Sequence, residues 1–235
     1  MLEQSAVFFD IDDTLLDNYC AFRCTLKEFF PDLSADEDYF KQLYCNFRRH
    51  SEEIYQRHLI GKRDSKHRYD RWLALLEALG KTDSNVVELE DYYHVCQSNQ
   101  TLTSEMRILL QVLKKSGVLC GVLTNGFTNK QQRKLEQLEI NRFIKSKWQF
   151  ISESFGDAKP NVSCFQKVAV QLPDNITQIF YLGDSFKNDI IPAHVANWKP
   201  IWLNQFDDEG ELLVPQAKSS EEAVIILLSR LLCSG

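Results

Sequence analysis

Short apolar runs alternate with longer amphipathic segments over most of this chain. Five runs have the character of buried strands, and they fall at residues 6–9, 118–124, 150–152, 179–183 and 200–203. Between the later runs, apolar residues recur at helical spacing, as in Met106, Leu109, Leu110 and Leu113. Alternating strands and helices predict an α/β fold with a doubly wound, Rossmann-like parallel sheet, which binds its ligands at the carboxyl ends of the strands.

The helices expected between and after these strands cover roughly 104–116, 129–138, 160–171, 185–196 and 221–232. Pro160 suits the first turn of the third of these helices because it has no N–H to leave unpaired. Ser219 and Ser220 are N-cap candidates for the last one.

A different pattern fills the stretch between the first and second strands. It contains no convincing strand, and the expected helices cover roughly 34–58, 65–79 and 85–96. Ser34 and Glu37 form a capping box at the start of the first helix. The chain should therefore have an α/β core made of 1–16 and 98–235, with an inserted all-helical cap at 17–97. Because the insert leaves the sheet directly after strand one, we expect it to lie over the carboxyl edge as a lid.

Composition narrows the class of protein. The 235 residues are 44% hydrophobic and 26% charged, which is ordinary for a globular chain. A net charge of −6 argues against binding a nucleic-acid polymer. Seven cysteines without a CxxC pair indicate neither a disulfide framework nor a zinc site. No apolar run approaches membrane-span length and no basic leader opens the chain, so we expect a soluble, cytoplasmic monomer or homodimer with no membrane partner.

Polar groups follow four of the predicted strands. They are Asp10, Asp12 and Thr14; Thr124, Asn125 and Gly126; Asp157 and Lys159; and Asp184 and Asp189. Taken singly, each group has a plain explanation as turn chemistry, exposed surface or a helix-dipole partner. Four such groups at four consecutive strand ends predict one shared site, because the carboxyl ends of parallel strands meet at one edge.

The first of these groups has the most specific chemistry. Asp10 and Asp12 would share a face if the strand continued, and two close carboxylates raise each other's pKa unless a cation neutralises them. One interpretation is a strand that runs into an acid-rich turn. The other is a carboxylate nucleophile beside a general acid/base at a metal site.

These motifs resemble, in order and spacing, the four motifs of the haloacid dehalogenase superfamily, and the insert looks like that family's type 1 cap. The resemblance implies that Asp10 is the nucleophile and Asp12 the general acid/base. It implies that Thr124, Asn125 and Lys159 bind the phosphoryl group. It also implies a Mg²⁺ site formed by Asp10, the Asp12 carbonyl and Asp184, with Asp189 supporting it from behind. Dehalogenases of this superfamily lack an aspartate at position 12, so the resemblance favours phosphoryl transfer.

Several core segments are similar to the pyrimidine 5′-nucleotidase subgroup. They include Thr124–Thr128 with Gln132–Glu136, Ile151–Asn161, and Trp202–Asn204. The cap is rich in aromatic and basic residues, either as a packed interior with a solvated face or as a lid that attracts anionic esters and stacks a base. The candidate substrate contacts in or beside it are Tyr19, Asn46, His50 and Tyr69.

The sequence therefore predicts a Mg²⁺-dependent phosphatase of small phosphorylated metabolites, with nucleoside 5′-monophosphates preferred. Sugar phosphatases and phosphomutases share the same machinery and remain alternatives. A non-catalytic binding module is the non-enzymatic alternative, although such proteins usually lose a motif residue.

Overall fold

The computed structural model describes residues 2–33, 36–59 and 69–233 and divides the chain into two compact units. The core unit comprises Met1–Leu16 and Thr101–Gly235, and the helical unit comprises Asp17–Gln100. The sequence placed the second boundary at 97/98, whereas the structure places it at 100/101. In the part of the chain that is described, no helix is both long and apolar enough to cross a membrane.

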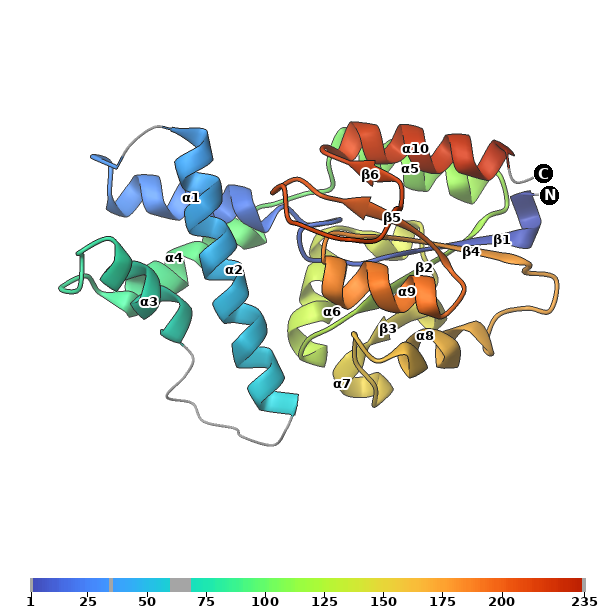
Figure 1. Ribbon diagram of the computed structural model, residues 1–235, viewed down its shortest axis with the longest axis horizontal. Coiled ribbons are helices and arrows are strands. Elements are labelled where there is room, and N and C mark those ends of the chain that lie inside the picture. Colours follow the sequence, from blue (N-terminus) through green and yellow to red (C-terminus); the bar gives the residue numbers. More distant parts are fainter. Residues whose placement is uncertain (1, 34–35, 60–68, 234–235) are drawn as a thin grey trace. The chain divides into compact units, whose positions relative to one another are not determined.

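The core unit is built on a six-stranded sheet in the order β3-β2-β1-β4-β5-β6 (Figure 1). Its strands are β1 (Ser5–Phe9), β2 (Leu119–Thr124), β3 (Gln149–Ile151), β4 (Gln178–Gly183), β5 (Lys199–Leu203) and β6 (Gln216–Ala217). Every neighbouring pair is parallel, which confirms the predicted doubly wound sheet. β6 was not predicted, because two residues are too few to show a pattern.

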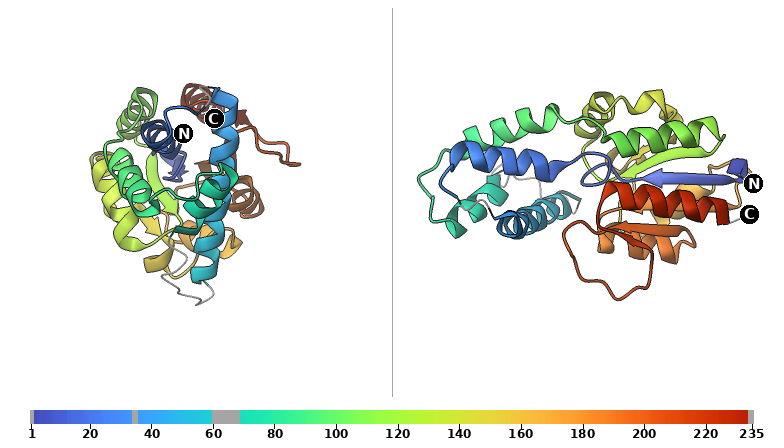
Figure 2. Two further views of the ribbon diagram at one scale, coloured as in Figure 1. Left: turned by 90° about the vertical axis from the view of Figure 1, so that its left-hand side faces the viewer. Right: turned by 90° about the horizontal axis from the view of Figure 1, so that it is seen from above.

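Helices cover both faces of this sheet. Figures 1 and 2 show α5 (Ser104–Lys115) and α10 (Ser220–Cys233) together on one face, with α8 (Val162–Ala169) and α9 (Ile191–Val195) on the other. All five residues of β1 are buried, as expected for a central parallel strand. The Phe8 ring packs at 5.2 Å from Trp198 and 6.2 Å from Phe150, measured between ring centroids.

Two helix predictions differ from the structure. Pro160 lies outside its helix, because Asn161 is the N-cap residue and α8 begins at Val162. The helix expected at 185–196 is divided into a π-helical turn, Phe186–Ile190, and the short helix α9. In that turn the Asn188 N–H donates to Ser185 Oγ and the Ser185 N–H donates to the Asp189 carboxylate. The wider turn therefore directs Asp189 back toward the strand end. Single π-helical turns are frequently found at functional sites.

Four helices make up the described part of the helical unit. They are α1 (Asn18–Phe29), α2 (Glu37–Leu59), α3 (Asp70–Ala78) and α4 (Val86–Ser98). The sequence predicted the last three but did not resolve α1 as a separate helix. Asn85 caps α4 by accepting from the Val87 and Glu88 N–H groups. The predicted cap residue Ser34 and the start of the second predicted helix lie outside the described residues.

An aromatic cluster fills the interior of this unit. Its rings belong to Phe22, Phe47, Trp72 and Tyr93, with centroid distances of 4.5 Å for Phe47–Trp72 and 5.8 Å for Trp72–Tyr93. Buried beside them, Glu90 accepts hydrogen bonds of 2.6 Å from both the Trp72 indole and the Arg71 guanidinium. These residues form the core of the unit, as predicted by the interpretation in which its aromatic residues make a packed interior.

Candidate active site

The site lies where the strand order reverses, at the carboxyl ends of β1 and β4. β1 pairs with β2 on one side and β4 on the other, and the Asp10 N–H continues the pairing with a 3.0 Å bond to the Leu182 carbonyl. Asp10 and Asp184 each follow the last residue of their strands. Adjacent strands therefore bring together two residues separated by most of the chain, at the position where doubly wound sheets bind ligands.

Asp10 is buried at this edge. Its side chain lies 3.0 Å from the ammonium of Lys159, measured from Oδ1 to Nζ. Burial raises the pKa of Asp10 to about 6, and Lys159 opposes that rise while Asp189 and Asp12 add to it. A carboxylate in this position is partly desolvated and faces a fixed cation, which suits a nucleophile that must approach an anionic group.

Lys159 is a fully buried cation, with only 2% of its side chain exposed. Its ammonium also lies 2.5 Å from Asp189 Oδ1 and donates to the Tyr181 hydroxyl at 3.0 Å. Burial would lower the pKa of Lys159, but the carboxylates of Asp10 and Asp189 outweigh burial and raise it. The side chain is therefore a permanently charged donor, held in place on several sides.

Asp189 is completely buried and forms an ion pair with Lys159. One carboxylate oxygen contacts Lys159 and the Tyr181 hydroxyl, and the other accepts from the Ser185 N–H at 3.0 Å. The Tyr181 hydroxyl also lies 2.8 Å from the Leu123 carbonyl, so its single proton has two acceptors. The absence of a side chain at Gly183 permits this packing, since a Cβ there would meet Asp189 Oδ2 at 2.5 Å.

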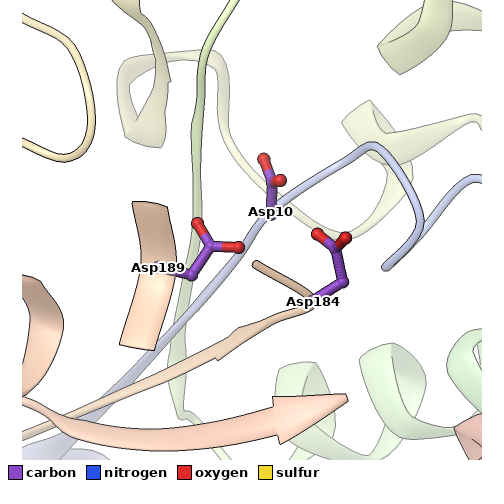
Figure 3. Close-up of side chains that lie close together, drawn as sticks. All are labelled: Asp10, Asp184 and Asp189. Atoms are coloured by element: carbon purple, nitrogen blue, oxygen red, sulfur yellow. The ribbon is translucent and has the colours of Figure 1, made fainter. Parts of the chain in front are cut away.

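Three carboxylates gather at this edge. Asp10, Asp184 and Asp189 each offer an oxygen, and these oxygens lie within 4.8 Å of one another (Figure 3). Both Asp189 oxygens have protein partners, so we expect Asp189 to hold Lys159 in place rather than to bind a cation. A buried all-oxygen set with excess negative charge fits a hard divalent ion such as Mg²⁺.

Asp12 does not share this cluster. Its carboxylate oxygens contact helix α6 (Thr128–Gln137), with Oδ1 at 2.6 Å from Lys134 Nζ and Oδ2 at 2.9 Å from Gln131 Nε2. β1 ends at Phe9, so the strand does not continue through Asp12 and the condition under which Asp10 and Asp12 would share a face is not met. A tight turn follows instead, with Asp13 at a φ of 55°.

The loop after β2 connects to the loop that carries Lys159. The Asn125 side chain donates to the Lys159 carbonyl at 2.7 Å and accepts from the Lys159 N–H at 2.9 Å. Thr124 is buried at the end of β2, next to Gln131. The structure thus brings Thr124, Asn125 and Lys159 to one edge and uses the Asn125 amide to fix the backbone of Lys159.

The four candidates in the helical unit make local contacts, and two of them, Asn46 and His50, contact each other. The Tyr19 hydroxyl donates to Glu37 at 2.6 Å, and the His50 ring contacts the Asn46 carbonyl at 2.8 Å. Asn46 is exposed and Tyr69 immediately precedes α3. Because the two units are described separately, their predicted contact with substrate stays a prediction.

Sequence reasoning missed three residues of the core site. Tyr181 looks like an ordinary aromatic residue in a buried strand, although a buried hydroxyl needs a polar partner. Gln131 and Lys134 look like solvated helix positions, and Lys134 was noted only within a longer segment. Their spacing of three residues on one helix face was the available signal.

Comparison with known proteins identifies a family and several relatives. The haloacid dehalogenase-like hydrolase family matches residues 4–197. A glyceraldehyde 3-phosphate phosphatase from Methanothermobacter thermautotrophicus is 28% identical over 212 residues, 88% of each chain. Pyrimidine 5′-nucleotidase YjjG from Escherichia coli is 34% identical over 86 residues, 36% of this chain and 37% of its own.

Solved structures show the same fold. The HAD-hydrolase YfnB from Bacillus subtilis, bound to magnesium, has a TM-score of 0.64 at 23% identity and covers 95% of this chain and 98% of its own. The L-2-haloacid dehalogenase from Xanthobacter autotrophicus has a TM-score of 0.66 at 13% identity, with the same coverage. Since the family matches residues 4–197, which is most of the chain, this protein belongs to the haloacid dehalogenase-like hydrolases.

Proposed function

We propose that this hydrolase is a phosphatase that cleaves small phosphate monoesters through an aspartyl-phosphate on Asp10. The observation that carries the proposal is the buried group of Asp10, Lys159 and Asp184 at one sheet edge. A phosphate monoester is an anion that repels a carboxylate, so attack by Asp10 requires fixed positive charge beside it. Asp12 supports the same assignment, because C–halogen hydrolysis needs no proton donor for its leaving group.

In this mechanism the residues divide the work between two displacements. Asp10 attacks phosphorus while Lys159 and the Thr124 hydroxyl bind phosphoryl oxygens. Asp12 protonates the leaving alkoxide and then accepts a proton from the water that cleaves the aspartyl-phosphate. Asp10, Asp184 and the Asp12 carbonyl are the groups that would hold Mg²⁺, which when bound supplies further charge neutralisation of the phosphoryl group.

Two substrate classes compete for this site. The segments that resemble pyrimidine 5′-nucleotidases favour nucleoside monophosphates, and the Escherichia coli nucleotidase supports them over about a third of the chain. A phosphorylated triose is the second candidate, favoured by the relative named as a glyceraldehyde 3-phosphate phosphatase, which matches over 88% of the chain. A cytoplasmic location and a monomeric or homodimeric state stay predictions.

Phosphate release from a panel of esters tests the proposal. UMP, dUMP and dTMP should be compared with glyceraldehyde 3-phosphate, glycerol phosphate and glucose 6-phosphate, with and without exhaustive chelation. Asp10→Asn should lower turnover by more than about a thousandfold without unfolding the chain, because an amide is a poor nucleophile. Chelation should abolish turnover and added Mg²⁺ should restore it.

The results separate the alternatives. A mutase would isomerise a phosphorylated sugar without releasing inorganic phosphate. If triose phosphate outranks every nucleotide in kcat/KM, the nucleotide preference is wrong and the phosphatase assignment stands. If Asp10→Asn keeps wild-type turnover, the aspartyl-phosphate mechanism is wrong.

A further inference from the structure

Two side chains on one face of α6 contact the carboxylate of Asp12. Gln131 Nε2 donates to Asp12 Oδ2 at 2.9 Å, and Lys134 Nζ lies 2.6 Å from Asp12 Oδ1. Residues three apart on a helix project from the same face, so α6 presents these two side chains together. Each oxygen of the carboxylate thus has its own partner, which fixes both the position and the rotation of the group.

This contact is built into the core unit and is not a mobile surface pair. Gln131 is buried, and the side chains of Lys134 and Asp12 are 17% and 33% exposed. Gln131 Nε2 also donates to the Asn125 carbonyl at 2.6 Å. Freely exposed ion pairs contribute little because they must order two flexible side chains, whereas here the partners are already held.

The loop after β2 is shaped to admit Gln131. Gly126 has a φ of 146°, and a Cβ at this position would approach the Gln131 side-chain nitrogen to 2.8 Å. The amide orientation follows from its surroundings, since the nitrogen faces Asp12, the Asn125 carbonyl and the Thr124 hydroxyl. A reversed amide would place an oxygen against the carboxylate. Gln131 therefore links Asp12 to the loop assigned to phosphoryl binding.

We infer that Gln131 and Lys134 are positioning residues that hold Asp12 in place for proton transfer, an inference that rests on the proposed phosphatase function. In the first displacement the Asp12 carboxyl gives its proton to the ester oxygen as the P–O bond breaks and the Asp10–phosphorus bond forms. In the second, the Asp12 carboxylate takes a proton from water as water oxygen bonds to phosphorus and Asp10 departs. Inorganic phosphate is released and the Asp12 carboxyl is restored, so protons balance over the cycle.

This role predicts a dependence on the leaving group. An alkoxide is strongly basic and needs a proton as it departs, whereas 2,4-dinitrophenolate is a weak base that departs without one. A misplaced Asp12 should therefore slow alkyl esters far more than 2,4-dinitrophenyl phosphate. A residue that serves only folding, or only binding of the phosphoryl group, would affect both esters alike.

The test compares kcat/KM for the best alkyl phosphate of the wild-type panel with kcat/KM for 2,4-dinitrophenyl phosphate. For each ester, kcat/KM reports the steps through release of the first product, and these steps include proton transfer to the leaving group. We expect Lys134→Met and Gln131→Leu to lower the alkyl value about 10- to 100-fold, part of the roughly 10²–10⁴-fold contribution of general acid–base catalysis. The dinitrophenyl value should change by less than about threefold.

Two controls accompany these variants. Arg133→Met removes an exposed charge from the same helix and should leave both values unchanged. Lys134→Arg keeps a cationic donor and should recover most of the alkyl activity. Thermal unfolding of each variant shows whether it is folded, and Lys134→Met decides the matter if Gln131→Leu does not fold, because Lys134 is partly exposed.

The outcomes are distinct. A loss confined to the alkyl ester supports the inference. An equal loss for both esters, or no loss for either, overturns the inference. The proposed function still stands in that case, provided that the wild-type chain hydrolyses the esters. A wild-type chain that hydrolyses none of the esters, with Mg²⁺ present, overturns the proposed function and the inference with it.

Discussion

Replacing Glu90 with glutamine should destabilise the helical unit by a predictable amount. The Glu90 side chain is only 3% exposed, and it accepts from Arg71 and Trp72 at 2.6 Å and from His94 at 3.1 Å. Glutamine keeps the size of the side chain but removes its charge. The variant therefore leaves the Arg71 guanidinium in a nearly buried position without its anionic partner.

The size of the effect follows from how well water can replace that partner. Removing one member of a fully buried ion pair costs about 3–5 kcal/mol. Arg71 is 16% exposed and its guanidinium also lies 4.7 Å from the Phe47 ring centroid, so some of its interactions persist. We therefore expect a loss of about 3 kcal/mol in the free energy of unfolding, at the lower end of that range. For a chain of this size, such a loss lowers the Tm by about 6–12 °C.

The pH dependence gives an independent check. Burial on its own raises the pKa of Glu90, but hydrogen bonds from His94 and Arg71 outweigh burial and hold that pKa well below its ordinary value of 4.5. A depressed pKa in the folded state means stabilisation that is complete above the ordinary pKa and is lost as pH falls through the folded one. The Tm difference between wild type and Glu90→Gln should be constant near neutrality and shrink as pH falls below about 4.5.

Calorimetric or circular-dichroism melting over pH 3–7 measures both effects. Asp91→Asn is the matched control, because Asp91 is an exposed acid on the same helix. It should shift the Tm by much less than Glu90→Gln does. A Tm for Glu90→Gln within 2 °C of wild type at pH 7, or a difference that grows on acidification, would refute the assignment of Glu90 as a buried ionic anchor; the margin is about 0.5–1 kcal/mol.

Three further predictions concern the core site. Asn125→Ala removes both side-chain bonds to the Lys159 backbone and should lower kcat/KM by about 10- to 100-fold, as expected for misplaced catalytic groups, with steady-state phosphate release as the assay. Lys159→Met leaves the buried carboxylates of Asp10 and Asp189 without their cation, so we expect a loss of about 3–5 kcal/mol in chemical denaturation together with the loss of turnover. Hydrogen bonds from Lys167, Ser163 and Asn161 outweigh partial burial and lower the pKa of Asp157 to about 2. Its stabilising contribution should therefore persist above pH 3.8 and disappear as pH falls toward 2, which wild-type and Asp157→Asn melts would show as converging Tm values.

The sequence alone determined the architecture of the core. Alternating apolar runs and amphipathic segments identified β1, β2, β4 and β5 nearly to the residue, because a strand buried on both faces is a continuous apolar run. Parallel strands place their carboxyl ends at one edge, so Asp10, Thr124, Lys159 and Asp184 could be assigned to one site. The signal was weaker where elements were short or irregular. β6 has two residues, and the turn that begins at Phe186 departs from α-helical spacing.

Local rules also fixed some helix ends and missed others. Ser219 was a recognisable cap candidate, since a short polar side chain can accept from the first free N–H groups, and its Oγ accepts from the Glu222 N–H. Pro160 was placed inside a helix because proline is favoured in the first turn, yet Asn161 serves as the cap instead. The helix therefore starts at Val162, two residues later than predicted, and a shift of this size depends on tertiary packing.

Only the tertiary structure decided which side chains of the site contact one another. Lys159 meets Asp189 thirty residues on, and Asp12 meets Lys134 one hundred and twenty-two residues on, so no local period records either contact. Sequence gives the face on which a helical side chain projects, but not the group that lies opposite. The fold alone brought Gln131 and Lys134 to Asp12 and turned Asp189 toward Lys159, because side-chain partners in a doubly wound sheet are set by strand order and crossover packing.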